Sequence, residues 1–240
     1  MSRLEAMSWP EVSRRSVAGA ILLIPSGATE QHGPHLPVTT DTDIAVAVST
    51  GASQRHPGMV VAPPLAYGSS GEHQGFAGTL SIGQDATEML LVELGRSASI
   101  DFATVIVVSA HGGNAVPLSR AMTRLQAEGH AVTAWSPSWS GDLHAGRTET
   151  SLMLAIDPGR VRLDQAEEGD LRPVQDLLPL LRQGGTLAVS ANGVLGDPAG
   201  ATADEGRRLL AEAVDQLVEF ADRSAAERPA EDDQTSRPGR

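Results

Sequence analysis

The chain has 240 residues, a formal net charge of -12, no cysteine and no lysine. The length fits one sizeable domain or two small ones, and the negative charge argues against a nucleic-acid partner, because phosphates require a basic surface. The missing residue types exclude thiol nucleophiles, thiolate metal sites, disulfides and Schiff-base chemistry.

Neither a signal peptide nor a membrane span is predicted. The first ten residues are polar and mixed, and no apolar run approaches the roughly 20 residues that a membrane helix needs. We therefore expect a cytoplasmic protein without a membrane partner.

Apolar runs typical of buried strands alternate along the chain with amphipathic segments typical of helices. A β-α-β-α order of this kind predicts an α/β fold whose sheet is mainly parallel, with helices on both faces. We expect one domain over residues 1–223 and a disordered tail over 224–240, which is rich in Ala, Glu, Asp, Pro and Arg. The expected strands are 20–24, 59–62, 104–109 and 131–135, the expected helices are 43–54, 85–100, 114–128, 149–156 and 202–221, and 71–83 is expected to be a loop or hairpin.

The first group of candidate metal ligands follows the first expected strand. Glu30 and His32 are two residues apart, so in an extended segment both side chains project to the same side. Asp41 lies just before the next expected helix, where an aspartate can bind one metal ion or bridge two. Carboxylates and imidazoles are the usual ligands of divalent metals. The alternative is a helix-capping aspartate beside a surface Glu-x-His.

A second group, Ser-Ala-His-Gly-Gly-Asn at residues 109–114, follows the clearest expected strand. His111 is placed where an open α/β sheet forms its binding crevice. Asn114 is expected to cap the following helix.

The third group, Asp-Leu-His-Ala-Gly-Arg-Thr-Glu-Thr-Ser at residues 142–151, opens another expected helix. Glu149 in the first turn is either a partner of the helix dipole or a metal ligand. The first two groups favour the ligand.

Taken together, these motifs resemble those of the creatininase (creatinine amidohydrolase) family. The resemblance rests on Glu-x-His-Gly-x-His-x-Pro, Thr-Asp, His-Gly-Gly-Asn and His-Ala-Gly-x-x-Glu-Thr-Ser, and runs from about residue 24 to 154. The third motif is similar to that of the family's peptidase branch in the mycofactocin pathway.

The resemblance implies a three-layer α/β/α sandwich, two divalent metal ions (zinc, iron(II) or manganese) and a homo-oligomer, a hexamer in the family. In creatininase itself the last carboxylate comes from His-x-Glu-Asn, but here Gly113 stands at the Glu position, so Glu149 replaces it. The implied ligands are Glu30, His32, Asp41, His111 and Glu149, with Asp41 bridging the two ions.

The implied catalytic residues are His144 and Glu149, with His144 expected to donate a proton to the leaving nitrogen or to stabilise the tetrahedral intermediate. Arg147 is expected to bind a substrate carboxylate through a planar two-point contact. Glu72 and His73 lie in a glycine-rich segment and are expected either to line the pocket or to belong to a solvated loop.

Three functions are compatible with these residues. The first is a metal-dependent peptidase that releases the C-terminal crosslinked Val-Tyr-derived unit from a modified precursor peptide. The second is an amidohydrolase that acts on a small cyclic amide or a formamide. The third is a non-catalytic scaffold that keeps the fold, and the retention of all five implied ligands argues against it.

Overall fold

The centre of the molecule is a four-stranded parallel sheet with the order β2-β1-β3-β4. This computed structural model describes residues 2–139 and 141–226. Strands β1 and β3 pair in register from Ile21 with Thr104 to Ser26 with Ser109, so both strands end at the same level. The strands are β1 (Ile21–Ser26), β2 (Met59–Val61), β3 (Thr104–Ser109) and β4 (Val132–Trp135).

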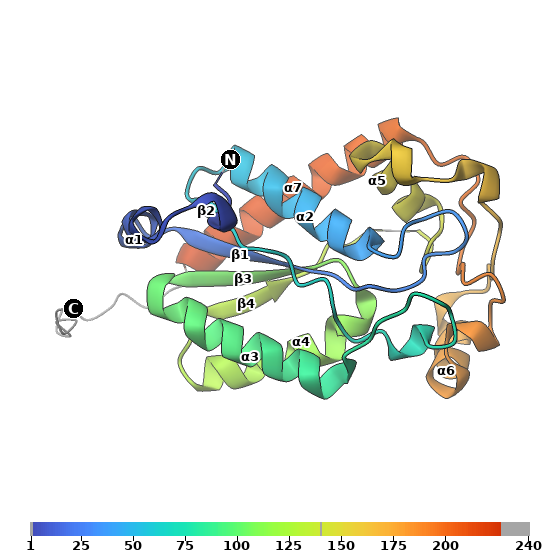
Figure 1. Ribbon diagram of the computed structural model, residues 1–240, viewed down its shortest axis with the longest axis horizontal. Helices are drawn as coiled ribbons and strands as arrows, with labels where there is room; N and C mark the ends of the chain where they lie inside the picture. The colour runs from blue at the N-terminus through green and yellow to red at the C-terminus, as the bar shows by residue number, and fades with distance from the viewer. Residues whose placement is uncertain (1, 140, 227–240) are drawn as a thin grey trace.

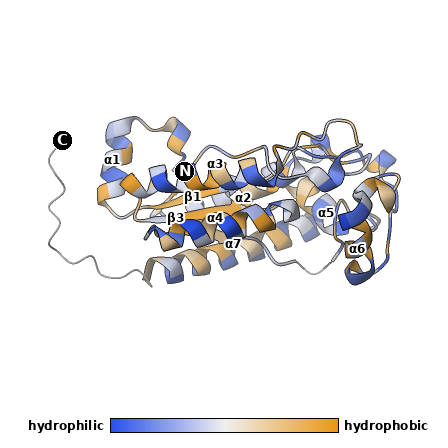
Figure 2. Cartoon of the chain, turned by 90° about the horizontal axis from the view of Figure 1, so that it is seen from below, coloured by the Kyte–Doolittle hydropathy of each residue, from blue (hydrophilic) through white to orange (hydrophobic). Residues whose placement is uncertain are grey.

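Helices cover both faces of the sheet, as the resemblance implied (Figure 1). On one face, Leu23 and Ile106 pack in a cluster with α2, α5 and α7. On the other face, Leu22 and Val105 pack with α3 and α4. Figure 2 shows the apolar strands enclosed between helices with polar outer faces. The helices are α1 (Trp9–Val17), α2 (Thr40–Arg55), α3 (Gly83–Asp101), α4 (Ala115–Ala127), α5 (Arg147–Ile156), α6 (Val174–Gly184) and α7 (Ala203–Ala226).

The continuous apolar runs predicted the two central strands because every residue of β1 and β3 is buried. Parallel strands that are covered on both faces lose the alternation of polar and apolar residues. Short 3-10 turns join the larger elements: η1 (Leu4–Ala6), η2 (Gly71–His73), η3 (Gly112–Asn114), η4 (Pro158–Arg160), η5 (Leu163–Gln165) and η6 (Thr186–Ala188).

Several expected boundaries were wrong. Helix α2 begins at Thr40, not at 43, so Asp41 lies within its first turn. The loop expected at 71–83 is present and contains the turn η2, but α3 begins at Gly83, not at 85. Helix α7 includes residues 224–226, which we expected to start the tail, while 227–240 lie outside the described residues. Helices α1 and α6 were not predicted.

Within the described residues, no helix is both long enough and apolar enough to cross a membrane.

The contact between α5 and α7 depends on a glycine. A Cβ atom on Gly206 would lie less than 3.0 Å from the carbonyl oxygen of Ser151. Because this neighbour is backbone, it cannot turn away. We expect Gly206→Val to lower the free energy of unfolding by about 1–3 kcal/mol, the usual cost of overpacking. Urea denaturation measures the change, and Gln216→Val, at an exposed position of the same helix, is the control. Equal stability of the two variants would contradict this account of the packing.

Candidate metal centre

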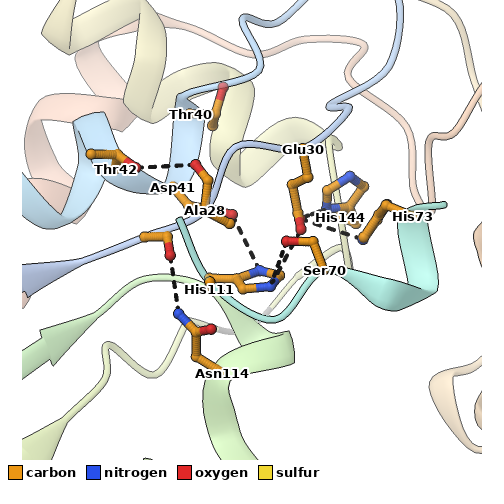
Figure 3. Close-up of polar contacts among 12 residues, drawn as sticks. Ala28, Glu30, Thr40, Asp41, Thr42, Ser70, His73, His111, Asn114 and His144 are labelled. Carbon is orange, nitrogen blue, oxygen red and sulfur yellow. Dashed lines mark hydrogen bonds and ion pairs between the residues drawn. The ribbon is translucent and has the colours of Figure 1, made fainter. Parts of the chain in front are cut away.

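The site lies at the carboxyl ends of β1 and β3, where an open parallel sheet forms its crevice. Glu30 follows β1, and His111 follows β3 at the start of η3. Both side chains are buried, and the exposed fraction of Glu30 is only 1%. In Figure 3 the carboxylate of Glu30 and the imidazole of His111 point toward each other.

Asp41 lies between two histidines. Its Oδ2 atom is 3.2 Å from Nδ1 of His111, and its Oδ1 atom is 3.2 Å from Nε2 of His32. Oε2 of Glu30 is 3.3 Å from Nε2 of His111. Ligand atoms of Glu30, His32 and Asp41 all lie within 4.8 Å of one another. The position of Asp41 is therefore that of a carboxylate able to bridge two ions.

Glu149 reaches the His32 side of this cluster from the first turn of α5. Its Oε2 atom is 3.9 Å from Nε2 of His32 and accepts a hydrogen bond from the backbone N–H of Ala145 at 2.6 Å. Ala145 has φ of 54°, a conformation that is unfavourable for a side chain with Cβ and is often found at functional sites. This strained residue directs the N–H group toward the carboxylate.

The chemistry of the donor set fits divalent cations. Both carboxylate oxygens of Glu30 and Oδ2 of Asp41 are buried without a hydrogen-bond partner among the described residues. A buried oxygen of this kind costs free energy, about 1–3 kcal/mol, and more when it is charged. Cations in contact with these oxygens would remove that cost. Three carboxylates and two imidazoles converge there, and this set suits zinc, iron(II) or manganese.

The ring orientations of two histidines agree with this fit. Nδ1 of His32 donates to the carbonyl oxygen of Glu30 at 3.1 Å, which leaves Nε2 as the ring nitrogen that faces Asp41 and could bind an ion once deprotonated. Nε2 of His111 donates to the carbonyl oxygen of Ser69 at 2.8 Å, which leaves Nδ1 facing Asp41. Histidines that bind metals usually donate their second ring N–H to a carbonyl or carboxylate.

Burial and opposite charge change the pKa values in this cluster. Burial and the nearby charge of Asp41 raise the pKa of Glu30 to about 8. Burial would lower the pKa of His32, but Asp41 outweighs it and raises the value to about 10. Burial would also lower the pKa of His111, but the charges of Glu30 and Asp41 outweigh it and raise the value to about 10. At neutral pH the ion-free protein therefore carries protons on groups that would bind ions.

Ion binding is consequently expected to release protons and to strengthen as pH rises. The raised pKa values keep protons on His32, His111 and Glu30 at pH 7, and each group needs a free electron pair to bind an ion. We expect the apparent affinity to increase between about pH 6 and 9. Calorimetric titration at one pH, in two buffers of different ionisation enthalpy, measures the released protons. Binding heats that do not depend on the buffer would contradict this prediction.

His73 and His144 form the solvent side of the cluster, with ring centroids 4.4 Å apart. Nε2 of His73 is 3.4 Å from Oε1 of Glu30, and Nδ1 of His144 is 3.9 Å from the same oxygen. Burial, followed by the nearby charges of His32, lowers the pKa of His73 to about 3 and that of His144 well below its ordinary value. Both rings are therefore neutral at pH 7.

Glu72 fills space that the chain leaves open at Gly113. A Cβ atom on Gly113 would lie less than 3.0 Å from Oε1 of Glu72, from the Ser69 carbonyl oxygen and from Nε2 of His111. Gly113 has no positive φ, so space and not backbone conformation requires a glycine there. Oε1 of Glu72 is 3.9 Å from Nε2 of His111. A carboxylate at residue 72 thus stands beside Gly113 and His111.

Arg147 lies away from the cavity. Its Nε atom donates to Oε2 of Glu205 on α7 at 2.8 Å, and the residue is not among those that line the cavity. The basic residue in the cavity wall is Arg182 on α6. The first turn of α5 directs residues 147 and 149 to different sides, and the binding of a substrate carboxylate by Arg147 stays a prediction.

Asn114 does not cap α4 with its side chain. Its Oδ1 atom accepts from the N–H of Ser69 at 3.0 Å, and its Nδ2 atom donates to the carbonyl oxygen of Gly27 at 3.0 Å. The side chain therefore joins the segment after β1 to the segment before η2. The first of these segments carries Glu30, and the second leads into η2, which contains Glu72.

A cavity of about 590 Å³ opens above the cluster. Of the candidate residues, Glu30, Asp41, Glu72, His73, His111, His144 and Glu149 line it, together with Trp139, Leu178 and Leu181. The sequence held no sign of α6 as a wall of this cavity. It also gave no sign of Gln31, whose buried side chain contacts two of the histidines.

The α/β/α sandwich, with buried carboxylates and imidazoles at the ends of its central strands, has the donor set of a metal-dependent hydrolase. The family model for creatinine amidohydrolase, Creatininase, matches residues 5–221. The chain therefore belongs to the creatininase family.

Relatives within this family are similar over most of the chain. The mycofactocin precursor peptide peptidase of Mycobacterium ulcerans (strain Agy99) is 52% identical over 207 residues, 82% of each chain. The protein of that name from Mycolicibacterium smegmatis (strain ATCC 700084 / mc(2)155) is 49% identical over 201 residues, 81% of each chain. A solved structure described as "Creatininase Mn" matches with a TM-score of 0.79 and 25% identity, over 92% of this chain and 97% of that one.

Proposed function

We propose that this protein is a metal-dependent peptidase that acts on a modified mycofactocin precursor peptide and releases its C-terminal crosslinked Val-Tyr-derived unit. The observation that carries the proposal is the sequence identity to peptidases that are named for this substrate. About half of the aligned residues are identical, over most of both chains. The cavity of about 590 Å³ above the buried cluster is large enough for a peptide end.

In the proposed reaction, two divalent ions would be held by Glu30, His32, Asp41, His111 and Glu149. Such ions supply Lewis acidity, which makes water a stronger acid and an amide carbonyl a better electrophile. Nδ1 of neutral His144 accepts the proton as water oxygen bonds to the carbonyl carbon. The same nitrogen then gives that proton to the leaving amine as the C–N bond breaks. His144 thus acts first as a base, because its ring is neutral when the substrate arrives.

Zinc, iron(II) and manganese remain the proposed ions, because all three accept carboxylate and imidazole ligands. A homo-oligomer, a hexamer by the family resemblance, is also proposed. Exposed Trp9 and Val17 on α1 are apolar side chains that a subunit contact would cover. Sedimentation analysis of the purified protein measures the assembly. The cytoplasmic location stays a prediction.

A panel of candidate amides tests the proposed function. The metal-loaded protein is incubated with the modified precursor peptide, the unmodified peptide, creatinine and a formamide, and the products are identified by mass spectrometry. We expect release of the C-terminal unit from the modified peptide alone. Glu149→Gln, which removes a proposed ligand, serves as the inactive control. Hydrolysis of creatinine or the formamide, with the modified peptide intact, would favour the amidohydrolase alternative and overturn the proposal.

A further inference from the structure

The side-chain amide of Gln31 has a fixed orientation between two proposed ligands. Its Oε1 atom accepts from the backbone N–H of Gly33 at 2.8 Å, and its Nε2 atom donates to the carbonyl oxygen of Gly193 at 2.9 Å. Exchanging the oxygen and nitrogen would place two donors together at Gly33 and two acceptors together at Gly193. The side chain is buried, so water cannot relieve either mismatch. Backbone groups therefore determine which way the amide points.

The second N–H of this amide determines the state of His73. Nε2 of Gln31 lies 2.8 Å from Nδ1 of His73, and because the amide nitrogen can only donate, Nδ1 must accept. A neutral imidazole then carries its proton on Nε2. That N–H faces Oε1 of Glu30 at 3.4 Å, one of the oxygens without a hydrogen-bond partner.

The main chain of the same residue determines the state of His144. The carbonyl oxygen of Gln31 lies 2.8 Å from Nε2 of His144, so Nε2 carries the proton and Nδ1 keeps its lone pair. Nε2 of Gln31 is also 3.1 Å from Nε2 of His144, but both atoms are donors and form no bond. The two packed rings thus present opposite groups toward Glu30, a donor from His73 and an acceptor from His144.

We propose that Gln31 is a positioning residue that divides the roles of these two histidines. Its side chain makes His73 a neutral ring whose Nε2–H faces the carboxylate of Glu30. Its carbonyl makes His144 a neutral acceptor at the cavity. The inference deepens the proposed function and rests on it only for the effect on turnover, because the tautomers follow from the hydrogen bonds alone.

Nitrogen NMR of the zinc-loaded protein, labelled with ¹⁵N histidine, reads the tautomers directly. The chain has seven histidines, and His73→Gln and His144→Gln assign the two resonances. We expect the proton on Nε2 in both rings of the native protein. A native spectrum with the proton of His73 on Nδ1 would overturn the proposal. This result decides the matter even if no Gln31 variant folds.

Gln31→Glu provides the second test, because a carboxylate accepts where the amide donates. We expect the proton to appear on Nδ1 of His73, while His144 keeps its tautomer because the main chain holds it. Turnover of the peptide should fall about 10- to 100-fold in kcat with little change in KM, the usual cost of losing a group that orients a ligand. Gln126→Glu makes the same change at an exposed position of α4 and is the matched control.

The outcomes separate this inference from the proposed function. If the tautomer of His73 is unchanged in Gln31→Glu, or if the tautomers of His73 and His144 change equally, the division of roles is overturned even if the peptide is hydrolysed. The expected tautomers in a protein that does not hydrolyse the peptide would confirm the positioning role of Gln31 and refute only the proposed substrate.

Discussion

Glu30→Gln is expected to abolish binding of one ion and to lower peptide turnover by roughly 10³-fold or more, because the Lewis acid is lost with its ligand. The ion-free variant should nevertheless be at least as stable as the native protein. Glu30 is buried without a hydrogen-bond partner, and burial together with Asp41 raises its pKa to about 8. At neutral pH this carboxyl must take up a proton on folding or bury its charge, and a neutral amide at the same position avoids both costs.

Thermal unfolding with and without ions measures both effects. Added ions should stabilise the native protein, by about 2.7 kcal/mol when the free ion is at 100 times its Kd, and should stabilise Glu30→Gln much less. Glu167→Gln, at an exposed position, is the control and should behave as the native protein. Two results together would contradict this account: Glu30→Gln unfolds more easily than the native protein when a chelator removes the ions, and it still binds both ions when they are supplied. Glu30 would then serve the fold and not the ions.

His144→Gln is expected to lower kcat by about 10²- to 10⁴-fold, the range for loss of a general acid or base. Glutamine can still donate to the Gln31 carbonyl, so the local hydrogen bond survives. It has no basic nitrogen in place of Nδ1, so the proton of the attacking water has no acceptor. The ion content of the variant should stay at the native value.

Metal analysis beside steady-state kinetics checks this prediction, with His130→Gln as the control because His130 lies outside the cluster, after α4. His144 also belongs to two possible ligand sets, one that includes Glu30 and one that includes His32. In each set the ligand atoms lie within 4.8 Å of one another. Loss of an ion in His144→Gln would therefore reassign His144 from base to ligand. Native turnover would contradict any role in the reaction.

The central sheet and the position of the site were predictable for physical reasons. Strands β1 and β3 are buried on both faces, so their centres are uninterrupted apolar runs, 21–24 and 105–108. Parallel strands require helical crossovers, and their carboxyl ends form one edge. Glu30 and His111, which follow these strands, therefore had to come close together. Glu149 could be placed in a first helical turn but not on a particular side of the cluster.

Features that depend on contacts between distant segments were not predictable. Gln31 binds Gly193, 162 positions away, and Arg147 pairs with Glu205 on another helix. The distance from Glu72 to Gly113 depends on how η2 packs against the end of β3. Helix α6 contains Pro179, which argues against a helix in sequence, although its apolar residues cover the cavity. Only tertiary packing decides such cases.

Anomalous diffraction from crystals grown with zinc or manganese tests the central claim most directly. We expect two peaks per chain on either side of Asp41, one in contact with Glu30 and His111 and the other with His32 and Glu149. The carboxylate of Asp41 should contact both ions. No peak between these side chains, or ions bound only at the surface, would contradict the assignment of this buried cluster as a metal centre.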